Sequence, residues 1–136
     1  MENRRTFLGL AAASLLPIVL DAQTATPPAV SELARHALSG PFEGFDAVLV
    51  QLNIPPGADG SGPGHRHPGP VLGYVAEGQM RFAINHETAK VIPAGGTFFE
   101  PNGAVHTTSG SARTDGPTRV LVFMIVPKGS PLTSPA

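Results

Sequence analysis

The chain has 136 residues, a formal net charge of −1, no cysteine, 16 glycines and 15 prolines. Without cysteine it has no disulfide, no thiolate ligand and no cysteine nucleophile, so any metal must be held by histidine and carboxylate groups. Its lysines and arginines form no run, which argues against binding to nucleic acid or to an anionic membrane surface. The many turn-forming residues favour a single domain of short strands over a helical bundle.

Residues 1–25 have the three parts of an export signal, namely a basic start, an apolar stretch and an exit of small and polar residues. The apolar stretch contains Pro17 and is shorter than the ~20 residues of a membrane-spanning helix, so we expect no stable membrane insertion after cleavage. The segment from Arg4 to Leu8 (RRTFL) resembles the twin-arginine signal, although Gly9 departs from it. The resemblance implies export of the folded protein to the periplasm or another extracytoplasmic space. The alternative is an ordinary export signal.

Residues 26–44 are expected to form a flexible leader and a first element. Within it, Ser31 to Leu38 fits a strand or a short helix, and we favour the strand. Asp46 to Ile54 (DAVLVQLNI) alternates and is rich in β-branched residues, which predicts a strand. The glycine- and proline-rich residues 55–64 are predicted to be a loop that leads to the two histidines at 65 and 67.

The remainder of the chain alternates short apolar segments with turns. Strands are predicted at residues 71–76, 80–85, 89–92, 97–99, 104–107 and 118–126, the last being the most apolar, and loops at 109–117 and from 127 onward. Closing a sheet of short strands removes its exposed edges. The predicted fold class is therefore all-β, as a small barrel or jelly roll.

Three histidines are the candidate metal ligands. His65 and His67 are one residue apart, and alternate side chains of an extended chain point to the same face. His106 follows the turn from Pro101 to Gly103 and is expected to face an otherwise apolar core. Three neutral imidazoles suit Zn, Cu, Fe or Ni and leave coordination positions open for water, substrate or O₂.

The two histidine-containing stretches together resemble the two motifs of the cupin superfamily. The residues that match the first motif are Gly60, His65, His67 and Gly78. Those that match the second are Gly95, Pro101, Gly103 and His106, with Gly110 in place of the final Asn. The resemblance implies a single cupin barrel (a double-stranded β-helix) over residues 45–127 and a C-terminal tail at 128–136. It also implies a divalent transition metal (Fe, Mn, Zn, Cu or Ni) on the three histidines.

Val71 stands where most cupins have a glutamate ligand, and Leu72 follows it. We therefore expect a site of three histidines only, with a more positive metal that favours an anionic substrate. Cupin dioxygenases that act on thiols or β-diketones also lack this glutamate. The first hypothesis is thus a metal-dependent oxygenase, lyase or isomerase acting on a small organic anion. The alternatives are a non-catalytic barrel that binds a small ligand or metal in the cell envelope, and a metal-free interaction barrel.

Two further residues are candidates for the site. Tyr74 would position substrate if it faced the pocket, although packing is its expected role. Glu100 precedes Pro101 and is either an exposed turn acid, which we expect, or a partner that orients an imidazole. Because no acid is evidently inward, no general base is assigned. Cupins are often dimers, so a homodimer through the apolar first strand is expected by analogy.

Overall fold

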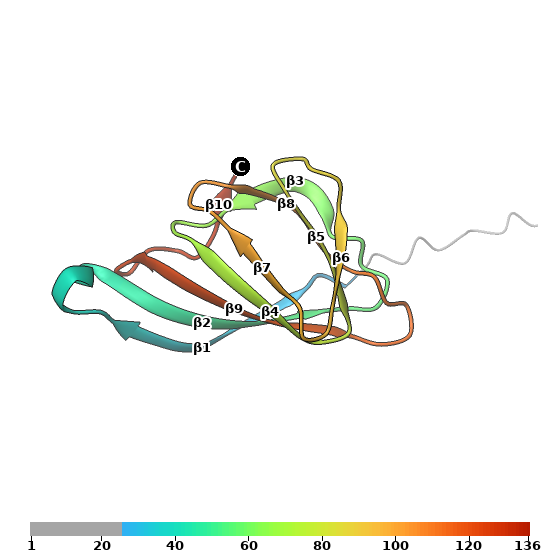
Figure 1. Cartoon of the computed structure of the whole chain (residues 1–136), viewed down its shortest axis with the longest axis horizontal. Helices are drawn as coiled ribbons and strands as arrows, with labels where there is room; N and C mark the ends of the chain where they lie inside the picture. The colour runs from blue at the N-terminus through green and yellow to red at the C-terminus, as the bar shows by residue number, and fades with distance from the viewer. Residues whose placement is uncertain (1–25) are drawn as a thin grey trace, which may run out of the picture.

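The computed structural model describes residues 26–136, which form two antiparallel five-stranded sheets (Figure 1). In chain order the strands are β1 (Ala29–Ala37), β2 (Phe45–Ile54), β3 (Ser61–Arg66), β4 (Val71–Glu77), β5 (Gln79–Ile84), β6 (Lys90–Pro93), β7 (Thr97–Glu100), β8 (Val105–Ser111), β9 (Thr118–Pro127) and β10 (Ser134–Pro135), with a single 3-10 turn, η1, at Gly40–Phe42. One sheet has the order β1-β2-β9-β4-β7 and the other β10-β3-β8-β5-β6. The predicted all-β class and double-sheet architecture are confirmed.

The ambiguous first element is a strand, because β1 pairs with β2 along most of its length. β9 pairs with β2 on one side and β4 on the other, so the most apolar segment of the chain lies at the centre of its sheet. Within residues 26–136 the structure has no helix of the length and apolarity needed to span a membrane.

Strand boundaries differ from the prediction where a distant neighbour supplies the pairing. Ser61 begins β3, in a segment predicted to be a loop, because it lies opposite Thr108 of β8. β8 continues to Ser111, which pairs with Met80 of β5. The C-terminal tail is not only loop, since its β10 pairs with the end of β3. In each case hydrogen bonds to a non-adjacent strand, which no local pattern encodes, extend the element.

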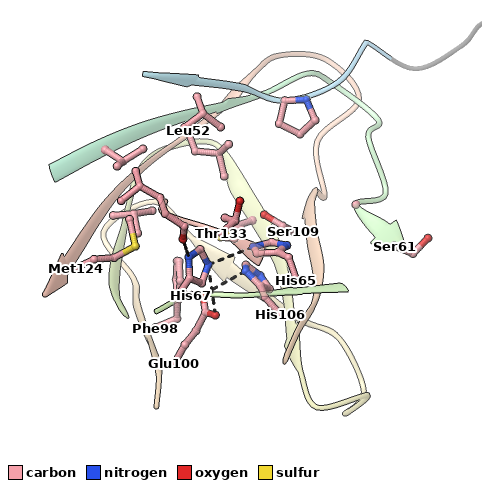
Figure 2. A pocket seen from close by; sticks show the side chains of 17 residues that line it. Leu52, Ser61, His65, His67, Phe98, Glu100, His106, Ser109, Met124 and Thr133 are labelled. Carbon is pink, nitrogen blue, oxygen red and sulfur yellow. Dashed lines mark hydrogen bonds and ion pairs between the residues drawn. The ribbon is translucent and has the colours of Figure 1, made fainter. Parts of the chain in front are cut away.

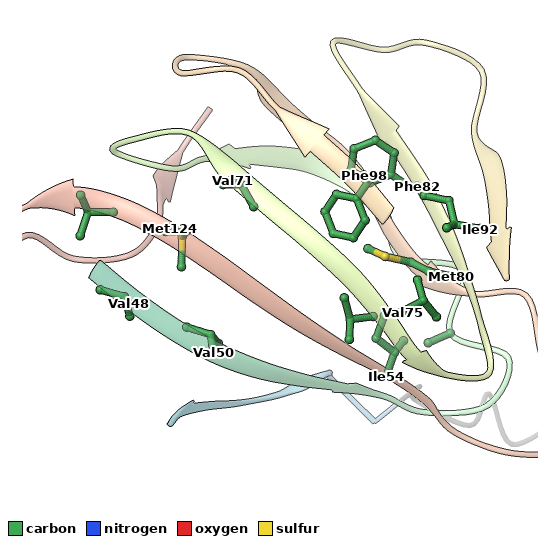
Figure 3. Close-up of a cluster of buried hydrophobic side chains, with 13 residues drawn as sticks. Val48, Val50, Ile54, Val71, Val75, Met80, Phe82, Ile92, Phe98 and Met124 are labelled. Atoms are coloured by element: carbon green, nitrogen blue, oxygen red, sulfur yellow. The ribbon is translucent and has the colours of Figure 1, made fainter. Parts of the chain in front are cut away.

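The hydrophobic core lies between the two sheets (Figure 3). It is built from every second residue along the strands, because successive side chains of a strand point to opposite faces of the sheet. Its buried members are Val48, Val50, Ile54, Ala58, Val71, Val75, Met80, Phe82, Ile92, Phe98, Val120, Met124 and Val126. Aliphatic side chains dominate, and the rings of the two phenylalanines, Phe82 and Phe98, lie near that of His106.

Gly73 and Phe98 lie opposite each other on β4 and β7. A Cβ atom on residue 73 would lie 2.0 Å from Cζ of Phe98, so only glycine leaves room for the ring. The Phe98 ring in turn packs on Phe82, with centroids 4.5 Å apart, and Phe82 lies 5.1 Å from the ring of His106. The glycine therefore places an aromatic wall beside the third histidine.

Candidate metal centre

Two neighbouring strands bring His65 and His106 together. The two residues are direct partners in the β3–β8 ladder, so their side chains project from the same face, and their ring centroids are 5.1 Å apart. His67 follows the end of β3 and meets His65 edge-on, with the two Nε2 atoms 3.1 Å apart (Figure 2). One ring nitrogen from each histidine lies within 4.8 Å of the others. The structure thus gathers the three histidines that the sequence singles out into a group that could hold a metal ion.

Backbone carbonyls orient two of the three imidazoles. His67 Nδ1 lies 2.8 Å from the carbonyl oxygen of Leu132, and His106 Nε2 lies 2.8 Å from that of Thr108. A carbonyl oxygen only accepts, so each of these ring nitrogens carries the proton and donates. In the neutral ring the lone pair is then on His67 Nε2 and His106 Nδ1. A fixed tautomer of this kind is typical of metal-ligating histidines.

Burial keeps the imidazoles neutral. His106 is 5% exposed, and burial, followed by the charge of His65, lowers its pKa to about 4. Burial is also the main cause that lowers the pKa of His65 and of His67. Since metals bind the deprotonated ring nitrogen, the three histidines are in the ligating form at neutral pH.

Glu100 is buried, and the expectation of an exposed turn acid is wrong. β7 runs one residue further than predicted, and along it Phe98 and Glu100 point inward whereas Thr97 and Phe99 face solvent. Glu100 is 2% exposed; its Oε1 lies 3.2 Å from His106 Nδ1 and its Oε2 lies 3.9 Å from His67 Nε2 (Figure 2). The alternation of inward and outward residues along a strand could have indicated that Glu100 is buried. Because Phe98 and Phe99 are both apolar, however, the sequence does not show which of the two faces inward.

The carboxylate of Glu100 lacks compensation in this environment. Its Oε2 is buried with no hydrogen-bond partner among the described residues, and burial raises the pKa of Glu100 to about 7. The nearby imidazoles are neutral, so they provide no counter-charge, and they turn lone pairs toward it. A buried acceptor of this kind is costly unless a cation or proton meets it. Three imidazoles and a carboxylate are a donor set that fits a divalent transition metal.

Neither Tyr74 nor Val71 lines the site. Tyr74 is 47% exposed, because on β4 it alternates with the buried Gly73 and Val75, and it is absent from the lining of the cavity. Val71 is 1% exposed and belongs to the apolar core.

A cavity of about 410 Å³ opens beside the three histidines and Glu100. Its walls are mostly aliphatic, and the polar side chains it adds to the site residues are Ser61, Ser109 and Thr133. Pro28 and Val30 from the N-terminal side and Leu132 from the tail complete its lining. The sequence did not predict that the C-terminal tail contributes to the site. Its Leu132 acts on His67 through a backbone carbonyl, and a sequence motif of side chains cannot identify such a contact.

Comparisons with known proteins agree with this architecture. Residues 50–124 match the family model Cupin_2, a cupin domain, whereas no curated protein sequence matches the chain. Among solved structures, the DMSP lyase DddQ from Ruegeria pomeroyi is 21% identical with a TM-score of 0.62, over 87% of this chain and 56% of the lyase chain. A cupin-like protein from Thermotoga maritima is 19% identical with a TM-score of 0.60, over 80% of this chain and 75% of its own.

The chain therefore spans little more than half the length of the lyase that it resembles. At these identities the likeness to solved structures concerns the fold. The family model, in contrast, matches more than half of the chain, and it does so over the segment that carries both histidine motifs. The chain belongs to the cupin domain family.

Proposed function

We propose that the protein is a metal-dependent enzyme that acts on a small organic anion, with His65, His67 and His106 as metal ligands. The observation that carries this proposal is the convergence of three neutral imidazoles, two of them fixed by backbone carbonyls, on the wall of a 410 Å³ cavity. A bound metal would supply Lewis-acid polarisation of the substrate or, if redox-active, O₂ binding.

The cavity limits the substrate class. In the part of the chain that the structure describes, no lysine or arginine lines it, so a metal would be the only positive charge available to an anionic group. Leu52, Val122 and Met124 offer apolar walls, which suit a compact carbon skeleton. The hydroxyl of Ser109 is a donor that can orient a polar substituent, whereas that of Ser61 donates to Asp59. These features favour a small, partly apolar anion.

The reaction is proposed to be an oxygenation or a non-redox elimination or isomerisation. A solved relative in fold is named as a DMSP lyase, which supports including β-elimination substrates in the test. The protein would be reconstituted with Fe, Mn, Zn, Cu and Ni, analysed for metal content, and assayed for O₂ consumption and for product release without O₂. We expect near-stoichiometric metal in the wild type and its loss in His106→Ala. No metal in the wild type after reconstitution would contradict the proposal.

A second candidate is a non-catalytic barrel that captures a small ligand or metal. It is favoured by the small number of polar side chains in the cavity beyond the histidines and Glu100. Ligand binding by the metal-loaded protein without turnover, across substrates that include thiols, diketones and small carboxylates, would support this candidate over the enzyme.

We further propose that the protein acts outside the cytoplasm. The proposal rests on the signal-like residues 1–25, which lie outside the described residues. Replacing Arg4 and Arg5 with lysine should retain the protein in the cytoplasmic fraction.

A homodimer stays a prediction. The side chains of Val30 and Leu33 on β1 are 64% and 52% exposed, and they would supply apolar contacts to a second copy of the chain. Sedimentation equilibrium would test this prediction.

A further inference from the structure

We infer that Glu100 is the fourth metal ligand and that it replaces, from the neighbouring strand, the carboxylate that Val71 removes. The inference rests on the proposed metal site and deepens it. It goes beyond the expectation of a site with three histidines only.

The register of the sheet explains how the replacement works. Val71 of β4 and Glu100 of β7 are direct cross-strand partners, and both are buried on the same face. Neighbouring strands are about 4.8 Å apart, and a glutamate side chain spans a comparable distance. The carboxylate of Glu100 therefore reaches the space that the carboxylate of a glutamate at position 71, on the adjacent strand, would occupy.

The carboxylate lies at the open side of the histidine group. Of the three ring pairs, His67 and His106 are the farthest apart, with centroids at 6.3 Å compared with 4.8 and 5.1 Å for the other two. Glu100 spans this wide edge, with one oxygen toward each ring (Figure 2). Ligand atoms bound at about 2.1 Å to one tetrahedral metal are roughly 3.4 Å apart. The 3.1, 3.2 and 3.9 Å separations in this group lie near that value, and the ligand atoms of the three histidines lie within 4.8 Å of one another, so the group must contract to hold one metal ion.

The atoms of His67, His106 and Glu100 that face the centre are electron-pair donors. His106 Nδ1 and His67 Nε2 present lone pairs, because their opposite nitrogens donate to backbone carbonyls. Glu100 Oε2 is buried and unpartnered within the described part of the chain. Acceptors that face one another in a buried space are mutually unfavourable, and a shared cation resolves the conflict.

The competing explanation is that Glu100 holds a proton and only orients His106 through a hydrogen bond to Nδ1. In that case the residue is a positioning group and makes no bond to the metal. The two roles differ in the number of oxygen ligands around the metal, which spectroscopy measures independently of activity.

The test compares Glu100→Gln with Glu87→Gln, which removes an exposed acid from the β5–β6 hairpin loop and serves as the matched control. Metal-free protein would be titrated with Zn²⁺ and Co²⁺ by calorimetry, and the Co²⁺ form examined by visible absorption and X-ray absorption. We expect Glu100→Gln to weaken affinity by about 100-fold or more and to change the Co²⁺ spectrum, because a neutral amide oxygen is a poor substitute for a carboxylate. Glu87→Gln should stay within about twofold of the wild type, as expected for an exposed surface position.

The outcomes separate this inference from the proposed function. Wild-type affinity and an unchanged Co²⁺ spectrum in Glu100→Gln would overturn the inference and leave a three-histidine metal site. Weaker affinity with an unchanged spectrum would also overturn it, in favour of the positioning role. Failure of the wild type itself to bind metal would overturn both the proposed metal-dependent function and the inference about Glu100.

Circular dichroism in chelator shows whether Glu100→Gln is folded. Should it not fold, Glu100→Asp keeps the charge but withdraws the carboxylate by one methylene. We expect reduced affinity and an altered Co²⁺ spectrum for that variant, and wild-type values for both would overturn the inference.

Discussion

Val71 and Glu100 lie directly opposite each other on β4 and β7, and both side chains point between the sheets. An acid is thus buried next to an apolar residue, while Phe99, its neighbour in the chain, is 57% exposed. This inversion of the usual pattern is costly in a purely structural strand, and it is explained if the acid serves the histidine group.

Exchanging the two residues is the first prediction. Glu100→Val alone should lose most of the metal affinity, and Val71→Glu combined with Glu100→Val should recover part of it, because the carboxylate then projects from the adjacent strand on the same face. Calorimetric titration with Zn²⁺ measures both. Leu72→Glu combined with Glu100→Val is the control, since Leu72 faces solvent. Equal recovery in the control would show that the position of the charge is irrelevant.

The stability of the metal-free protein should depend on pH through Glu100. Burial raises its pKa from an ordinary 4.5 to about 7 in the folded state. The folded protein therefore binds more protons than the unfolded chain between these values. The stabilising contribution is fully present below pH 4.5 and is lost as the pH rises through 7.

Glutamine cannot ionise, so Glu100→Gln should gain stability relative to the wild type as the pH rises, by up to about 3 kcal/mol. Urea denaturation in chelator at pH 5 and pH 8 measures this difference. An equal difference at the two pH values would contradict the prediction. His106, whose lowered pKa makes stability rise between pH 4 and 6.5, contributes to both proteins and largely cancels in the comparison.

Removing residues 131–136 should weaken metal binding while leaving the barrel folded. The deletion removes the Leu132 carbonyl that orients His67 and the Leu132 side chain that packs against the core, but only the two residue pairs of β10 from the sheets. Loss of such an orienting partner costs roughly 10- to 100-fold in metal affinity. Deleting only residues 134–136 keeps the carbonyl and should retain most of the affinity. If the two deletions weaken binding equally, the carbonyl of Leu132 has no special importance.

Gly73→Ala should destabilise the protein by about 1–3 kcal/mol, as overpacking of a filled core does. The added methyl would lie 2.0 Å from the Phe98 ring, which must then move toward Phe82 and the histidines. Thermal denaturation measures the loss. Combining Gly73→Ala with Phe98→Leu removes the ring and should recover part of the stability. A double variant that is less stable by the sum of the two single losses would exclude this contact as the cause.

The sequence alone determined the features that depend on local order. Alternation in Asp46 to Ile54 and the apolar segment ending at Val126 predicted strands that the structure contains. The spacing of His65 and His67 predicted that their side chains converge, and Gly95, Pro101, Gly103 and His106 carried the resemblance to cupins that the family match supports. These patterns are readable because period and turn chemistry are properties of neighbouring residues.

Only the tertiary structure decided which other groups lie beside the histidines. The segment from Thr97 to Glu100 allows either alternation, and its pairing with β4, through Val71, turns Glu100 inward and leaves Phe99 in solvent. Likewise, the Leu132 carbonyl reaches His67 across 65 positions of the chain. Strand register and backbone contacts of this kind depend on residues far apart in sequence, so the burial of Glu100 follows from pairing between strands and not from its own neighbours.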